Sequence, residues 1–248
     1  MKPLAGVRVL VTRPEAQAAP LCAALEELGA VTVRLPVLQI EAIAENQTLQ
    51  QIAENLAHIQ KLIFISTNAV EYALPTLLAI NSQILKAIPC FAVGKSTAQA
   101  LQLYNLNVKA APAPFNSESL LTLPELQTLP NERVVIVRGE GGRELLAESL
   151  KARGAQIEYC DVYRRILPQL EKVPEKVDII LITSSEGLKN LTILLGDCAW
   201  LRHTPLVLIS ERIAAPDWQA PLFAATRASD EGLIQALLEW QQVNPHVR

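Results

Sequence analysis

Short, continuous runs of apolar residues recur along the chain, and each run is closed by polar residues. Ile179–Ile182 is the clearest of them. Such runs are typical of strands in a parallel sheet that helices cover on both faces. Between the runs, leucines recur at helical spacing, as at Leu21, Leu25 and Leu28, and Gly29 then suits the left-handed end of a helix. The pattern predicts an α/β fold.

The same pattern occurs twice. Arg8–Glu15 resembles Arg133–Glu140, and Leu62–Val70 resembles Ile180–Leu188. Each first segment predicts two strands and each second segment three, which gives about five strands per domain. We therefore expect two similar, doubly wound parallel-sheet domains.

The order of the repeated segments leaves two domain arrangements open. Consecutive segments could pair, or the two middle segments could form a domain inserted into one built from the outer two. The second arrangement needs two crossings, near Pro36–Ile40 and Tyr163–Pro168. Both are short extended stretches with a proline at one end, so they suit a hinge.

Composition excludes several classes of protein. Half of the 248 residues are apolar, and the 22 Lys and Arg are outnumbered by 25 Asp and Glu, which disfavours disorder and nucleic-acid binding. No apolar run approaches the ~20 residues that span a bilayer. The start, Met1–Gly6, lacks the apolar core of a signal peptide, so we expect a cytoplasmic protein without membrane contact.

Neither a metal site nor a nucleotide site is indicated. Four cysteines stand singly in apolar surroundings, where we expect buried structural thiols, and the three histidines lie far apart. Gly139-Glu140-Gly141-Gly142 is not the dinucleotide motif GxGxxG, and no GxxxxGK[ST] occurs.

The candidate chemistry lies at the predicted strand ends. In doubly wound sheets, ligands bind outside the carboxyl ends of the strands, and helix N-termini there bind anions. Ser and Thr at such places are also ordinary helix caps. Their repetition in both halves favours a cleft rich in donors for an anionic ligand. The candidate substrate-binding residues are Thr12, Arg13, Ser66, Thr67, Asn68, Gly94, Lys95, Ser96, Arg138, Gly139, Thr183, Ser184, Ser185, Ser210 and Arg212.

Tyr163 is the candidate catalytic residue. It lies in Asp161–Arg165, where a tyrosine beside two arginines can donate a proton or hydrogen bond towards an anionic ligand. The plainer interpretation is a tyrosine packed at a domain junction. No Ser-His-Asp, Cys-His or paired-carboxylate arrangement is evident.

Taken together, these segments resemble the uroporphyrinogen-III synthases over nearly the full length of the chain. Each motif is weak alone, but their order and spacing are specific. The segments that carry the resemblance are Leu10–Pro14, Phe64–Val70, Val93–Leu101, Val137–Gly139, Val162–Arg164, Thr183–Leu188 and Asp230–Leu233.

The resemblance implies a fold and a reaction. It implies a terminal domain from residues 1–36 and 168–248, an inserted central domain 41–162, and a two-strand hinge at 37–40 and 163–167. It implies a lyase of heme biosynthesis that cyclises hydroxymethylbilane, a linear tetrapyrrole rich in carboxylates, in a cleft between the domains. The last pyrrole ring is inverted, water is lost, and no cofactor takes part.

The resemblance also bears on single residues and on partners. A tyrosine matching Tyr163 is proposed in this family to assist departure of the hydroxyl. The family often has Thr before the serine of its first Ser-x-Asn-Ala motif, where this chain has Ile65. We expect a monomer, and leave open a transient contact with hydroxymethylbilane synthase.

A second hypothesis is a non-enzymatic two-domain hinge protein that closes on an anionic small molecule. The same strand-end donors would serve it. The absence of an export signal at the start of the sequence stands against it.

Overall fold

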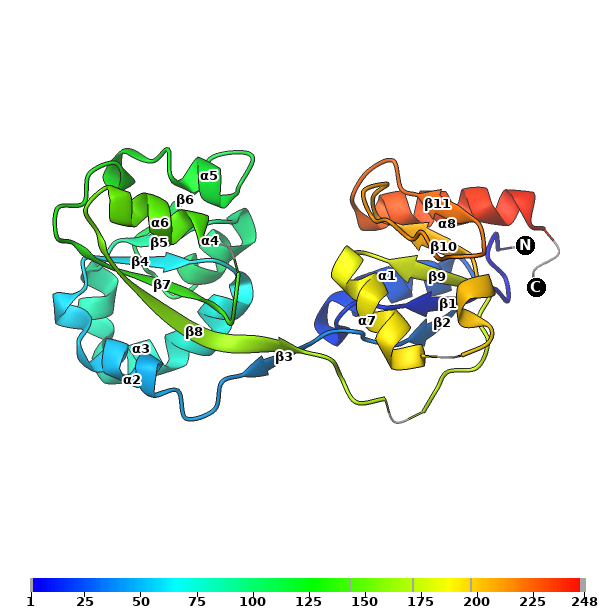
Figure 1. Ribbon diagram of the computed structural model, residues 1–248, viewed down its shortest axis with the longest axis horizontal. Coiled ribbons are helices and arrows are strands. Elements are labelled where there is room, and N and C mark those ends of the chain that lie inside the picture. Colours follow the sequence, from blue (N-terminus) through cyan, green and yellow to red (C-terminus); the bar gives the residue numbers. More distant parts are fainter. Residues whose placement is uncertain (1, 143, 171, 197, 246–248) are drawn as a thin grey trace. The chain divides into compact units, whose positions relative to one another are not determined.

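The computed structural model describes residues 2–142, 144–170, 172–196 and 198–245. The chain forms two compact units, unit 1 from Met1–Gln39 with Ile166–Arg248, and unit 2 from Ile40–Arg165 (Figure 1). Unit 2 is therefore inserted into the chain of unit 1, as one of the two expected arrangements requires. The domain limits and the hinge stay predictions.

Unit 1 is built around a parallel sheet. Among its described residues this sheet has five strands in the order β11-β10-β9-β1-β2. The central strand β1 pairs in parallel with β2 on one side and with β9, from the far end of the chain, on the other. The strands are β1 Arg8–Val11, β2 Val31–Arg34, β9 Ile179–Ile182, β10 Leu206–Leu208 and β11 Leu222–Ala224.

Helices cover both faces of this sheet. Val9 and Val11 of β1 pack in one apolar cluster with side chains of α1 and α8, whereas Leu10 packs in another cluster with side chains of α7. Successive residues of a strand point to opposite faces, so both faces are buried, which explains the unbroken apolar runs. The helical segments are α1 Glu15–Glu27, α7 Ser185–Leu195, α8 Asp230–Val243 and a 3₁₀ turn Leu201–His203.

Unit 2 has the same plan. Within its described residues the sheet has six strands in the order β3-β8-β7-β4-β5-β6, and the strands from β8 to β6 pair in parallel. The sixth strand is β3, a short edge strand beside β8 that the pattern of apolar runs did not suggest. The strands are β3 Gln39–Ala42, β4 Lys61–Phe64, β5 Cys90–Ala92, β6 Val108–Ala110, β7 Arg133–Gly139 and β8 Gln156–Ile166.

Both faces of the second sheet are covered as well. Leu62 and Phe64 of β4 pack with α2 and α3, while Ile63 packs with α5 and α6. The helical segments are α2 Gln47–Glu54, α3 Thr67–Ala87, α4 Lys95–Gln102, α5 Ser117–Leu120, α6 Leu145–Ala152 and the 3₁₀ turns Leu56–His58 and Pro124–Leu126.

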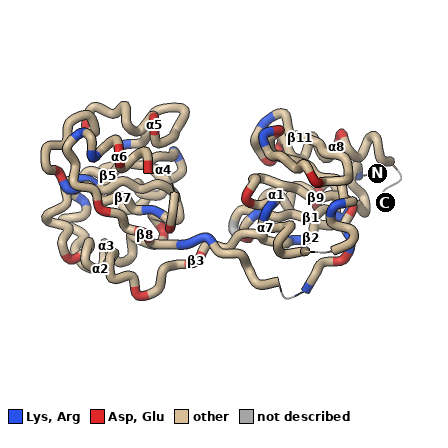
Figure 2. Tube along the Cα trace, in the orientation of Figure 1, with Lys and Arg blue, Asp and Glu red and all other residues tan. Residues whose placement is uncertain are grey.

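Three of the four cysteines lie in the core, as expected for structural thiols. Cys22, Cys90 and Cys160 are buried free thiols, but Cys198 is only half-buried, so the expectation of four buried thiols was wrong at that position. Basic and acidic residues are interspersed along the trace (Figure 2). In the part of the chain that the structure describes, no helix combines the length and apolarity needed to cross a bilayer.

Candidate functional site

The predicted site residues of unit 2 gather at one edge of its sheet. Strands β5, β4, β7 and β8 are parallel neighbours, so the segments that follow them emerge side by side. This edge brings together Ser66, Thr67, Asn68, Gly94, Lys95, Ser96, Arg138 and Gly139.

Two helices begin at this edge with different caps. The Ser66 Oγ accepts a hydrogen bond of 3.1 Å from the Ala69 amide at the start of α3. Gly94 begins α4 without a side-chain cap, and Lys95 and Ser96 that follow are exposed. The first amides of a helix carry a partial positive charge, so both helix ends can bind an anion.

Tyr163 reaches the same edge because of a bulge in β8. The register passes from the pair Arg138–Asp161 directly to the pair Gly139–Tyr163, which leaves Val162 as an extra residue. Val162 and Tyr163 consequently pack in the same apolar cluster, although consecutive strand residues normally point to opposite faces. Bulges often redirect a side chain in this way next to functional sites.

The Tyr163 side chain is buried, yet its hydroxyl has a polar partner. Its Oη lies 3.0 Å from the Oγ of Ser66, and either group can be the donor. Its ring centroid lies 6.1 Å from that of Tyr72 on α3. A Cβ on Gly139 would lie 2.4 Å from the Tyr163 ring, so glycine is required there for the ring to occupy its place.

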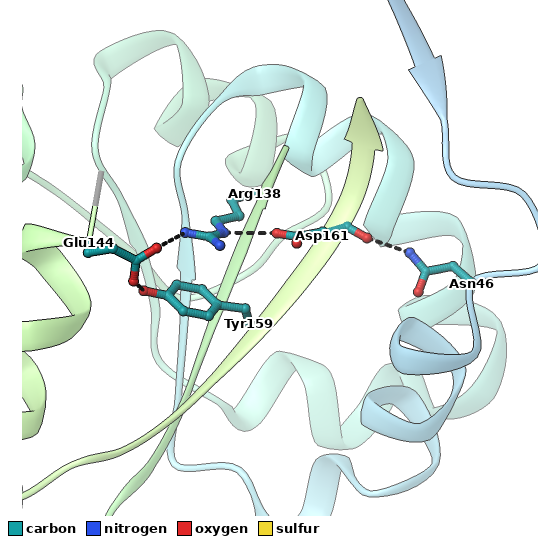
Figure 3. A network of polar contacts seen from close by, with 5 residues as sticks. All are labelled: Asn46, Arg138, Glu144, Tyr159 and Asp161. Carbon is teal, nitrogen blue, oxygen red and sulfur yellow. Dashed lines mark hydrogen bonds and ion pairs between the residues drawn. The ribbon is translucent and has the colours of Figure 1, made fainter. Parts of the chain in front are cut away.

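Arg138 is held by a polar network that spans β7, β8 and the start of α6 (Figure 3). Its Nε donates to Asp161 Oδ1 at 2.8 Å, and its guanidinium carbon lies 3.5 Å from the centre of the Tyr159 ring. Glu144 accepts from the Tyr159 hydroxyl at 2.5 Å and lies 3.5 Å from Arg138 Nη1. Asn46 donates to the Asp161 carbonyl at 2.6 Å.

The network shifts the pKa values of its members. Burial alone would lower the pKa of Arg138, but the hydrogen bond and charge of Asp161 outweigh it and leave this pKa raised. Burial, followed by the hydrogen bond to Glu144, raises the pKa of Tyr159 to about 12. The same hydrogen bond holds the pKa of the Glu144 carboxyl below its usual value. Arg138 is thus a cation and Tyr159 a neutral phenol at physiological pH.

A pocket of about 170 Å³ opens beside this network, entirely within unit 2. Its polar lining includes Arg138, Glu140, Tyr159, Tyr163 and Arg165, and the loop that follows β7 forms one wall. Ser66 does not line the pocket, but it contacts Tyr163, which does. The pocket therefore combines two guanidinium groups, one carboxylate and two phenols.

The candidates of unit 1 also gather at the carboxyl edge of their own sheet, after β1, β9 and β10. The Thr12 hydroxyl is buried and donates to the Leu181 carbonyl at 2.7 Å, so in this structure it ties β1 to β9. Arg13 forms an ion pair of 2.5 Å with Asp230 at the start of α8. The hydroxyl of Ser184 caps α7 through the Gly187 amide.

The remaining candidates of unit 1 are more open. Ser185 and Arg212 are exposed, and Thr183 and Ser210 are half-buried. Ser210 Oγ accepts a hydrogen bond of 3.3 Å from the Arg212 amide. These side chains lie at the same strand ends, with fewer polar contacts than the residues around Arg138 in unit 2.

Sequence reasoning missed Tyr159, Asp161 and Glu144 as partners of Arg138. Tyr159 and Asp161 flank the buried Cys160 in a strand, which places them together on one face. That alternation was a usable signal, but the register that sets Asp161 opposite Arg138 is not visible in the sequence.

Over residues 2–142, 144–170, 172–196 and 198–245, no three His, Cys, Asp or Glu side chains meet in a way that would hold a metal ion.

Comparison with known proteins gives a consistent result. The family model described as uroporphyrinogen-III synthase HemD matches residues 19–235. The chain is 32% identical to the uroporphyrinogen-III synthase of Escherichia coli K12, covering 92% of this chain and 99% of that one, and equally identical to that of Salmonella typhimurium LT2, with the same coverage. The uroporphyrinogen-III synthetase structure of Helicobacter pylori 26695 shares the fold, with a TM-score of 0.65, 18% identity and coverage of 94% of this chain and 99% of that one.

Proposed function

Because the chain belongs to the uroporphyrinogen-III synthase family, we propose that it cyclises hydroxymethylbilane to uroporphyrinogen III, with inversion of the last pyrrole ring and loss of water. We assign it to the lyases on the same ground, since a carbon–oxygen bond is broken without hydrolysis or redox change. The proposal needs no cofactor.

The observation that carries the proposed mechanism is the contact between Tyr163 and Ser66 at the carboxyl edge of the sheet. A phenol held by a hydroxyl is suited to donate a hydrogen bond to the departing hydroxyl of the substrate. When the carbon–oxygen bond breaks, that oxygen takes a proton and leaves as water. The cation that remains on the ring that carried the hydroxyl is then attacked by the substituted carbon of the last pyrrole ring, which gives a spirocyclic intermediate. Its rearrangement inverts that ring and closes the macrocycle, and the proton lost as the pyrrole becomes aromatic again balances the one that left with the water. A positioned proton donor typically contributes about 10²–10⁴ in rate.

The other groups at this edge suit a polyanionic substrate. Helix N-termini at α3 and α4 and the Arg138 guanidinium are donors for carboxylates. We propose substrate contacts for the strand-end candidates of unit 1 as well, through backbone amides where, as at Thr12, the hydroxyl is already bonded. Holding the two ends of a reactive chain in one geometry is catalysis by orientation.

We propose a monomer that works in the cytoplasm, and a transient contact with hydroxymethylbilane synthase, which makes the substrate.

The decisive test uses freshly prepared hydroxymethylbilane. Without an enzyme this compound closes to the type I isomer. The purified protein is expected to yield the type III isomer, separated by chromatography after oxidation to the porphyrins. If only type I accumulates, the proposed activity is wrong, and tight binding of the bilane without turnover would point to the non-enzymatic hinge protein instead.

A further inference from the structure

The Arg138 guanidinium is fixed from two directions before any ligand arrives. Asp161 accepts from its Nε at 2.8 Å, and the Tyr159 ring lies against its face at 3.5 Å. The Arg138 side chain is 13% exposed. An arginine oriented in this way loses little conformational entropy when it binds a carboxylate.

The outer edge of the same guanidinium has donors to spare. Nη1 lies 3.5 Å from Glu144, a long contact to a carboxylate that is 56% exposed. Among the described residues, the carboxylate partners of the guanidinium are Asp161 at Nε and Glu144 at Nη1, and Nη2 has no carboxylate partner. A planar guanidinium held at Nε presents its Nη atoms as a fork that matches a carboxylate.

This fork borders a pocket that holds a second guanidinium. The charged residues that line it are Arg138, Arg165 and Glu140, while Asp161 and Glu144, the carboxylate partners of Arg138, lie beside it. The attraction for a carboxylate therefore comes from the guanidinium donors and not from a net positive charge. Gly141 and Gly142 form part of the wall with φ values of +74° and +116°, a backbone conformation that glycine adopts without strain. At about 170 Å³ the space suits one side chain bearing a carboxylate, not a whole pyrrole chain.

The pocket also adjoins the proposed proton donor, since Tyr163 lines it together with Arg138. Gly139 is the register partner of Tyr163 and lies against its ring, and Arg138 is the residue before Gly139 in β7. A carboxylate held by Arg138 would fix its pyrrole ring close to Tyr163.

We infer that Arg138 binds one carboxylate of the tetrapyrrole in this pocket, and that Asp161 and Tyr159 are positioning residues that aim its guanidinium. The inference rests on the proposed function and adds a specific subsite to it. Glu144 completes the support by holding the Tyr159 hydroxyl.

A purely structural role for the network is the competing explanation, and a matched pair separates the two. Arg133 and Glu158 form an ion pair of 3.0 Å between the same strands, β7 and β8, near their amino ends and away from the pocket. Glu158→Ala removes a bridge of the same kind without touching Arg138.

The experiment measures kcat and KM for the bilane and the melting temperature of each variant. Arg138→Lys keeps the positive charge but loses the forked donor geometry. Asp161→Ala keeps the guanidinium but removes the carboxylate that orients it. Each is expected to raise KM by roughly 10-fold while kcat changes by less than about threefold. The reason is that the lost contact holds the substrate and the transition state equally strongly. Glu158→Ala should leave KM unchanged.

Tyr159 supplies a second comparison. Tyr159→Phe keeps the ring beneath Arg138 and removes the hydroxyl with its bond to Glu144, whereas Tyr159→Leu removes the ring as well. We expect the KM increase to be several-fold larger for Leu than for Phe at similar melting temperatures.

The outcomes are distinct. Wild-type protein that gives only the type I isomer defeats the proposed function. Wild-type protein that gives type III, with variants that melt earlier at unchanged KM, supports a structural role and overturns the inference.

Discussion

At the scale of single residues, the candidate site depends on residue 139 being a glycine, which has no side chain. The Tyr163 ring occupies the space that a Cβ on residue 139 would take, and the bulge at Val162 turns the ring into the same core cluster. Its hydroxyl then meets Ser66 at 3.0 Å. The position and orientation of the phenol are thus fixed by residues that are distant in the sequence, Gly139 and Ser66, rather than by the residues next to it in the chain.

Tyr163→Phe should lower kcat by about 10²–10⁴, because the proton donor is lost while the ring still packs. The fraction of type I isomer should rise as the uncatalysed closure competes. Steady-state kinetics and isomer analysis measure both. Tyr72→Phe, which removes a hydroxyl from the neighbouring ring, is the control and should keep wild-type turnover. An unchanged rate for Tyr163→Phe would remove this residue from the mechanism.

Gly139→Ala should destabilise the protein by about 1–3 kcal/mol, since the new methyl group must displace the Tyr163 ring. Urea unfolding measures the change. In a Tyr163→Ala background the same substitution should cost clearly less, because the ring it displaces is absent. Equal costs in the two backgrounds would show that the clash does not govern this position.

At the scale of elements, three helices begin with the same serine N-cap. Ser66, Ser184 and Ser229 each accept a hydrogen bond from the backbone amide three residues later, at 3.1, 2.9 and 3.2 Å, and so cap α3, α7 and α8. Ser66 differs from Ser229 in its further contact with the Tyr163 hydroxyl. The cap and the proposed catalytic contact share one oxygen.

That sharing gives a test of whether Ser66 does more than cap α3. Ser66→Ala and Ser229→Ala should each cost about 1 kcal/mol of stability, the usual cost of losing a serine cap. Only Ser66→Ala should also lower kcat, because the Tyr163 hydroxyl loses its partner. Thermal melting and turnover are compared for the two variants. A parallel loss of activity in both would mean that Ser66 acts through stability alone.

The elements were largely predictable because burial on both faces leaves a simple signature. The apolar run Ile179–Ile182 is a strand, and Gly29 has a φ of +97° just after the first helix, as its position suggested. The edge strand β3 and the half-polar strand β8 lack that signature. The bulge, the Arg138–Asp161 register and the buried hydroxyl of Thr12 depend on which strands pair, which local pattern does not encode.

At the scale of the whole molecule, two core thiols link stability to pH. Burial raises the pKa of Cys90 and of Cys160 from the ordinary 9.0 to about 12. Between pH 9 and 12 the folded protein therefore keeps protons that the unfolded chain releases. Their contribution to stability is complete below pH 9 and is lost as pH rises through this window, at most by about 1.4 kcal/mol per pH unit for each thiol.

The variant Cys90→Ala/Cys160→Ala should accordingly lose less stability than the wild type between pH 8.5 and 10.5, whatever its stability at pH 7. Urea unfolding across that range gives the two slopes, and other groups cancel in the comparison. Identical slopes would contradict the assignment of raised thiol pKa values. Native Cys90 and Cys160 should also resist alkylation at pH 8, whereas denatured protein should react.

The insertion of one unit into the other has a consequence for synthesis on the ribosome. The central strand β1 of unit 1 needs β9 as its neighbour, and β9 is translated only after all of unit 2. Unit 2 has its whole sequence available earlier and can fold while unit 1 still waits. During that interval β1 and β2 are exposed as an incomplete sheet, which makes the emerging amino-terminal segment the part of the chain most in need of a chaperone.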